Sequence, residues 1–417
     1  MSKHRVRRVC APTRVGLGAA ACTAVVMAVT GTASADESAV PILSGSCPGL
    51  YVLGVQGTSE SSPNADPFAN SGMLGQIFEP MMAQGVDLEH ATIPYDAAFG
   101  GAPGTGSGTE TFANSVSAAQ ARLDASAAAV IAQCPGTRLA IVGFSQGGGV
   151  AADFARRTGA GEGPVSADQV AAVAVMSDWT RPNGAEPIPG RPGQVTPDAP
   201  PDTDGVATSQ VRLPAVPGTG GIAADNTGFG DLTGRVGEFC AAGDLSCDAP
   251  GHAAALRTVA GIAAQADFLD PIAAVQSLGA AWSSTVAKAS NQVILEDIQV
   301  ADGQVNYLPG ESVSQRLADS ADPRISDPSA QQTEAATDKI SRIATAIVAD
   351  PIGQIPRLVG QIGAAVAANL ADNADLANPA VLAHYGNVIA NHTGYGSDGT
   401  AQQTAEWFAA VSHDLHG

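Results

Sequence analysis

The stretch Arg138-Leu139-Ala140-Ile141-Val142-Gly143-Phe144-Ser145-Gln146-Gly147 decides the fold class. Residues 138–144 form an apolar run that predicts a buried strand, and the small residues after Ser145 predict a helix through Arg157. The junction carries a G-x-S-x-G pattern, which is typical of a strained turn that exposes a nucleophilic serine hydroxyl. The alternative is a glycine-rich turn with a structural serine.

The segments around this stretch alternate between strands and helices. Apolar runs predict further buried strands at 50–55, 91–95, 170–176 and 235–239. Helical spacing predicts helices at 73–82 and 109–133. Such alternation is typical of the α/β class, with a three-layer α/β/α sandwich around a central, mostly parallel sheet.

Two segments interrupt the alternation. Residues 181–230 are crowded with Pro, Gly and Asp and predict a long surface loop. Residues 248–380 carry helical patterns, notably at Ile340, Ile343 and Ile347, and predict a mainly helical insertion with an irregular polar stretch at 310–338. The insertion is a candidate lid, and the alternative is that its apolar faces pack on the main sheet.

Composition limits the classes of partner. The chain has 417 residues, with 40 acids against 20 bases and a formal net charge of −20. Binding to nucleic acid or to anionic lipid by charge needs clustered Lys and Arg, so the composition argues against both.

The first 35 residues differ from the rest. They hold bases and no acid, continue into an apolar run at 15–31, and end in Ala33-Ser34-Ala35. This pattern predicts a signal peptide, 1–35, cleaved near Ala35, and hence a secreted protein in the extracellular space or cell envelope. The alternative, a transmembrane anchor, fits poorly because the run is short and broken by Gly and Thr.

Four cysteines follow the predicted cleavage site: Cys47, Cys134, Cys240 and Cys247. An even number in an exported protein predicts two disulfides, for which three pairings exist. A zinc site would need Cys and His residues more closely clustered, so we expect neither a metal nor another cofactor.

A nucleophilic Ser145 would need a base, an acid and a site for the oxyanion. The N–H of Gln146, at the start of the predicted helix, is a candidate oxyanion donor. The order serine, acid, histidine leaves Asp244 as a candidate acid, although a solvated turn acid is the plainer interpretation. The candidate bases that follow it are His252, His384 and His392.

Four segments together resemble the cutinase family of serine esterases. They are Cys47-Pro48-Gly49 through Glu60, Cys134-Pro135 through Gly147, Phe239 through Cys247, and His392-Thr393-Gly394-Tyr395-Gly396. The resemblance covers 47 to about 180, 231–247 and 384–412, and its cysteine spacings are more specific than the serine motif.

The resemblance implies a cutinase-like α/β-hydrolase fold and a Ser145, Asp244, His392 triad. It also implies disulfides from Cys47 to Cys134 and from Cys240 to Cys247, and Thr58 as a second oxyanion contributor beside Gln146. In the family the histidine lies much closer to the second loop cysteine. The expected catalytic domain, 36–247 and 381–417, is therefore split by an insertion that must leave and return near the site, and His384 and His252 remain alternative bases.

The expected function is a secreted carboxylic ester hydrolase that acts on lipid-like or polyester substrates through an acyl-enzyme. One alternative is an acyltransferase that moves an acyl or mycoloyl group to a sugar or other alcohol. Another is a non-catalytic cell-surface protein on a hydrolase scaffold. The expected partners are the ester substrate and, through the insertion, envelope lipids, with no nucleic acid; we expect a monomer.

Overall fold

The computed structural model describes residues 46–416, so the predicted signal peptide lies outside the described residues. Five strands form a parallel sheet in the order β2-β1-β3-β4-β5. Their bounds are Leu50–Val55 (β1), Leu88–Thr92 (β2), Arg138–Phe144 (β3), Val170–Met176 (β4) and Val236–Phe239 (β5). Only β2 departs clearly from its predicted span, 91–95: its ladder with β1 ends two residues before Pro94, which has no N–H to donate.

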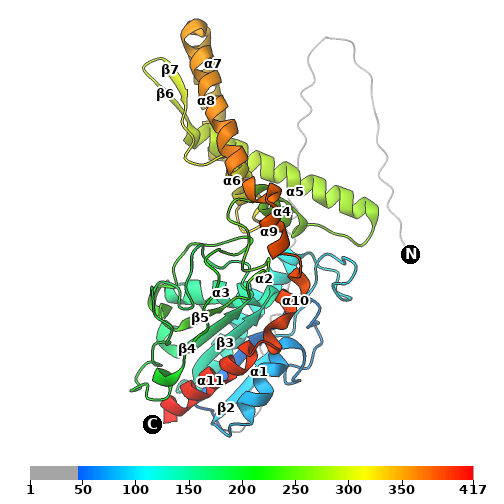
Figure 1. Cartoon of the computed structure of the whole chain (residues 1–417), viewed down its shortest axis with the longest axis vertical. Helices are drawn as coiled ribbons and strands as arrows, with labels where there is room; N and C mark the ends of the chain where they lie inside the picture. The colour runs from blue at the N-terminus through cyan, green and yellow to red at the C-terminus, as the bar shows by residue number, and fades with distance from the viewer. Residues whose placement is uncertain (1–45, 417) are drawn as a thin grey trace, which may run out of the picture. The chain divides into compact units, whose positions relative to one another are not determined.

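Helices cover both faces of this sheet. Helices α2 (Phe112–Gln133) and α3 (Gln146–Gly159) pack on one face, and α1 (Gly72–Met82) and α11 (Thr400–His416) lie side by side on the other (Figure 1). Because both faces of the sheet are buried, the sequences of the strands are continuous apolar runs. The three-layer α/β/α architecture predicted from the sequence is confirmed.

The strand order determines where a site can form. Strands β1 and β3 are neighbours, and the chain leaves their carboxyl ends toward helices on opposite faces, which opens a crevice at that edge. The loop with Thr58 follows β1, Ser145 follows β3, Ser177 follows β4 and the Asp244 loop follows β5. The candidate groups therefore meet at the carboxyl edge of the sheet.

The long loop at 181–230, which was predicted to lie on the surface, also contributes buried residues. It holds short 3-10 turns, and apolar side chains such as Ile188 and Leu213 are buried in it. Its first residue, Arg181, is fully buried and donates hydrogen bonds to the carbonyl oxygens of Ala185, Pro217, Thr219 and Cys247. The buried guanidinium thus fastens the loop to the segment that carries Asp244.

The segment after β5 is mainly helical, as expected. Its helices are α4 (Ala254–Ala263), α5 (Pro271–Gln292), α6 (Val313–Ala321), α7 (Ala330–Ala349) and α8 (Pro351–Ala371), followed by the short α9 (Pro379–His384) and α10 (Val388–Thr393). A β-hairpin, β6 (Ile298–Ala301) and β7 (Gln304–Tyr307), was not predicted.

The expectation that 310–338 forms an irregular polar stretch is wrong. It contains α6 and the beginning of α7, and both helices begin at a serine cap. The side chain of Ser312 accepts the N–H of Gln315, and that of Ser329 accepts the N–H of Gln332. The polar residues of this stretch therefore belong to helices: the beginning of α7 is largely exposed, whereas α6 is mostly half-buried or buried. Within residues 46–416, no helix is both long and apolar enough to cross a membrane.

Candidate active site

Ser145 occupies a tight turn between β3 and α3. Its φ of 55° lies in the left-handed region, which costs energy for a residue with a side chain. The glycines on either side allow the turn: a Cβ on Gly143 would lie 2.0 Å from the carbonyl oxygen of Gly147, and a Cβ on Gly147 would lie 2.0 Å from that of Val55. The G-x-S-x-G pattern is therefore a steric requirement of this junction.

His392 stands between Ser145 and Asp244. Its Nε2 lies 2.8 Å from the Ser145 Oγ, and its Nδ1 lies 2.9 Å from the Asp244 Oδ1. The three side chains come from the end of β3, the loop after β5 and the last turn of α10. The structure thus brings together the three residues predicted from the sequence, although 148 positions separate Asp244 from His392.

Asp244 is fully buried in a loop closed by the Cys240–Cys247 disulfide. Burial alone would raise the pKa of its carboxyl group. Hydrogen bonds and the charge of His392, with further hydrogen bonds from Ser177 and Tyr395, outweigh burial and hold the pKa below its usual value. The carboxylate is therefore ionised at neutral pH, where it can orient and stabilise an imidazolium.

The loop after β1 lies against Ser145. Thr58 and Gln146 line the same cavity as Ser145, and Gln146 is the first residue of α3, where backbone N–H groups have no partner within the helix. Glu60 holds the loop: its carboxylate accepts the N–H of Gly57 at 3.1 Å and that of Met73 at 3.0 Å. Burial raises the pKa of Glu60, and these two hydrogen bonds partly offset that rise.

The alternative bases lie elsewhere. His252 is exposed, and His384 places its Nε2 2.9 Å from the Asp248 carboxylate. Neither histidine is among the described residues that line the Ser145 cavity. The geometry therefore favours His392 over both. The second predicted disulfide, Cys47–Cys134, is also present and joins the start of β1 to the end of α2.

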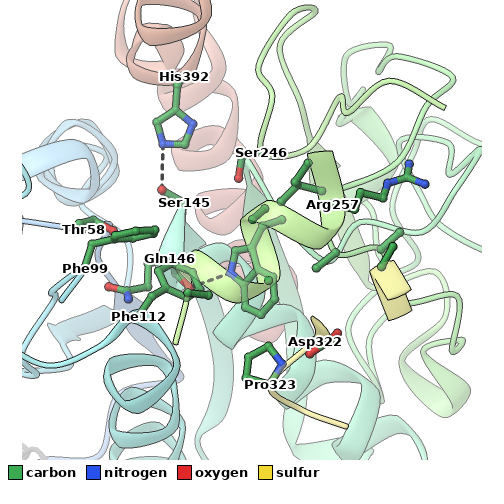
Figure 2. Close-up of a pocket in the computed structure, with 18 of the residues that line it drawn as sticks. Thr58, Phe99, Phe112, Ser145, Gln146, Ser246, Arg257, Asp322, Pro323 and His392 are labelled. Atoms are coloured by element: carbon green, nitrogen blue, oxygen red, sulfur yellow. Dashed lines mark hydrogen bonds between the residues drawn. The ribbon is translucent and has the colours of Figure 1, made fainter. Parts of the chain in front are cut away.

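A cavity of about 960 Å³ opens beside Ser145. Figure 2 shows Thr58, Phe99 and Phe112 on one side of it, and Arg257, Asp322 and Pro323 of the insertion on the other. Helices α4 and α6 supply much of the second wall. The insertion thus forms a wall of the cavity.

Two contributors were not predicted. The Ser177 Oγ lies 2.9 Å from the Nδ1 of His392, and the Tyr395 hydroxyl donates to the Asp244 Oδ2 at 2.7 Å. Tyr395 was part of the H-x-x-Y-G pattern but had no assigned role. The only sequence signal for Ser177 is its position directly after β4, which lies beside β3, the strand that Ser145 follows.

Comparisons with known proteins identify relatives of this chain. A family model described as cutinase matches residues 46–269. The protein named "Carboxylesterase Culp6 homolog" of Corynebacterium glutamicum is 32% identical over 236 residues, which cover 53% of this chain and 71% of that protein.

Solved structures show weaker similarity. The catalytic core domain of acetyl xylan esterase from Trichoderma reesei is 20% identical, covers 56% of this chain and 99% of that chain, and gives a TM-score of 0.36. A cutinase-like protein from Cryptococcus sp. is 16% identical, covers 50% of this chain and 82% of that chain, and gives a TM-score of 0.30.

Proposed function

Since the chain belongs to the cutinase family and is a carboxylic ester hydrolase, we propose that it is an exported serine esterase that cleaves bulky, lipid-like esters through Ser145, His392 and Asp244. The proposal assigns catalysis to 36–247 and 381–417 and a substrate wall to the insertion, 248–380. The pattern at 1–35 supports export.

The proposed reaction proceeds through an acyl-enzyme. Neutral His392, with its proton on Nδ1 toward Asp244, removes the Ser145 proton at Nε2 as the Oγ attacks the ester carbonyl. The N–H of Gln146 and Thr58 stabilise the tetrahedral oxyanion. As the carbon–oxygen bond to the alcohol breaks, His392 returns the proton to the leaving alkoxide. Water then attacks the acyl group in the same way, releasing the acid and restoring Ser145.

One observation carries this proposal: a single imidazole lies within hydrogen-bond distance of both the strained serine and a buried carboxylate. An alkyl fluorophosphonate should therefore label one serine, and peptide mass spectrometry should locate the adduct on Ser145. His392→Ala should slow the labelling strongly, whereas His252→Ala should not. An adduct elsewhere, or labelling that His392→Ala leaves unchanged, would refute the triad.

The size of the cavity supports the proposal that the substrate is bulky. Its volume lies at the upper end of the usual range for small-ligand sites, so an acetyl group would fill only a small part of it. Phe99, Phe112 and Trp179 give the core part of the cavity an aromatic lining, and the small residues Ala260 and Gly261 of α4 line the part formed by the insertion. We therefore expect α4 to limit the length of the acyl chain that the cavity accepts.

Narrowing the cavity should change chain-length preference. We expect Ala260→Trp to lower kcat/KM for a long-chain p-nitrophenyl ester about tenfold or more, while the acetate ester loses little. Val259→Trp is a matched control, because Val259 is its exposed neighbour on the same helix. Equal losses on both esters in Ala260→Trp would contradict a role of α4 in substrate length.

The insertion also supports contact with a lipid surface. Among the described residues, large apolar side chains are exposed outside 248–380 only at Met82, Val195, Val206, Leu382 and Ile389. Helix α8 exposes Ile352, Ile355, Val359, Ile362, Val366 and Leu370, and α5 exposes Ile272, Val275, Trp282 and Val286. Neither helix holds an acid, in a chain with 40 of them. These faces lack the negative charge that would oppose docking on lipid.

Vesicle binding tests this contact. The triple variant Ile355→Gln, Val359→Gln, Ile362→Gln should lose most cosedimentation with phosphatidylcholine vesicles and keep its activity on a soluble acetate ester. Val206→Gln, which changes an exposed residue of the 181–230 loop, is the control. If the triple variant instead changes a dimer into a monomer and leaves vesicle binding intact, the face binds a second copy and the lipid contact is wrong.

A further inference from the structure

The chain leaves the catalytic core for the insertion, and returns from it, beside the candidate triad. A second histidine–aspartate pair, His384 and Asp248, connects the two ends of this excursion. Asp248 follows the Asp244 loop immediately, and His384 ends α9, just before α10 carries His392 back to the sheet (Figure 1). The His384 Nε2 lies 2.9 Å from the Asp248 Oδ2, and the Tyr385 hydroxyl donates to the Asp248 carbonyl oxygen at 2.6 Å.

Asp248 also holds the Asp244 loop. It is buried, its Oδ2 accepts the N–H of Gly243 at 2.7 Å, and its own N–H donates to the Asp244 carbonyl oxygen at 2.7 Å. The hydroxyl of Thr219 donates to the other carboxylate oxygen. One side chain thus contacts the loop of the acid and the segment that leads to the base.

The two segments fit closely at Gly243. Its φ of 78° is left-handed, and a Cβ there would lie 2.6 Å from the Asn391 side-chain nitrogen and 2.8 Å from the His384 carbonyl oxygen. Asn391 directly precedes His392. The spacing between the Asp244 loop and α10 is therefore set at the point where Asp248 and His384 meet.

We propose that Asp248 and His384 are positioning residues that hold His392 in line with Asp244 and Ser145. They take no part in proton transfer, because neither lines the cavity. The inference rests on the proposed triad and assigns a function to a histidine that the sequence alone left as an alternative base. A small displacement of a catalytic group lowers the rate of the chemical step much more than it weakens substrate binding.

The test uses His384→Ala, His384→Gln and Asp248→Asn in the full chain. We expect His384→Ala to lower kcat on the order of tenfold and to change KM less than twofold. His384→Gln, whose amide can still donate to Asp248, should recover most of the rate. The low-field proton resonance of the His392–Asp244 hydrogen bond should shift or broaden in His384→Ala and return in His384→Gln. Because both residues act through one contact, Asp248→Asn with His384→Ala should lose little more than Asp248→Asn alone.

His252→Ala is the matched control, since His252 is an exposed histidine in the segment where the chain leaves the core. An unchanged kcat in His384→Ala would overturn the proposal, as would a rise in KM alone or a rate loss with the low-field resonance unaltered. Ser145→Ala separates this failure from failure of the triad. If Ser145→Ala is inactive while His384→Ala is fully active, only the positioning role is wrong.

Discussion

Ser145→Ala should reduce ester hydrolysis by about 10⁴-fold or more and abolish fluorophosphonate labelling, while the fold is retained. The hydroxyl oxygen is the only heavy atom that the substitution removes. The strained backbone of the turn depends on Gly143 and Gly147, whose close contacts remain. Circular dichroism and a thermal melt should match those of the unsubstituted protein.

Ser177 is poorly placed to replace the Ser145 Oγ as the nucleophile. Ser177 also lies within hydrogen-bond distance of His392, but it faces the Nδ1 atom, and it is not among the described residues that line the cavity. Ser283→Ala, on exposed α5, controls for the loss of a serine hydroxyl remote from the cavity. If Ser145→Ala retained more than about a hundredth of the activity, Ser145 would not be the nucleophile.

Asp244→Asn should lower kcat by about 10³- to 10⁴-fold with a much smaller change in KM. An amide nitrogen facing the Nδ1 of His392 would favour the tautomer that carries its proton on Nε2. That tautomer cannot accept the proton of Ser145, and the imidazolium formed on attack would lose its buried counter-charge.

Steady-state kinetics on a soluble ester would measure this effect. Asp302→Asn is a suitable control, because Asp302 lies in the exposed turn between β6 and β7 and keeps a positive φ that asparagine tolerates. A loss below tenfold in Asp244→Asn would show that another group orients His392, and the triad would then need a different acid.

The sheet could be predicted because its signals are local. A parallel strand buried on both faces must be apolar throughout, and the elbow must be rich in glycine, so 138–147 reveals both without reference to the rest of the chain. The disulfide loop around Asp244 and the H-x-x-Y-G pattern around His392 are similarly compact. Together with the resemblance to the cutinase family, these patterns are enough to name the three candidate residues.

The remaining features depend on contacts between distant segments. Ser177 reaches His392 because β4 lies beside β3, and the Asp248–His384 contact spans 136 positions. The prediction for 310–338 is wrong because a polar amphipathic helix and a polar loop have similar composition. The capping serines of this stretch are the signal that distinguishes the two.

We expect the disulfide between Cys240 and Cys247 to make the activity depend on the redox state of the surroundings. With free thiols, the segment around Asp244 would lose its covalent closure, and the carboxylate would be held by hydrogen bonds alone. Cytosolic reductants keep such cysteines reduced, so the chain should acquire its full hydrolytic activity only after it reaches an oxidising compartment. A cell that makes this esterase would thereby protect its own internal esters during synthesis.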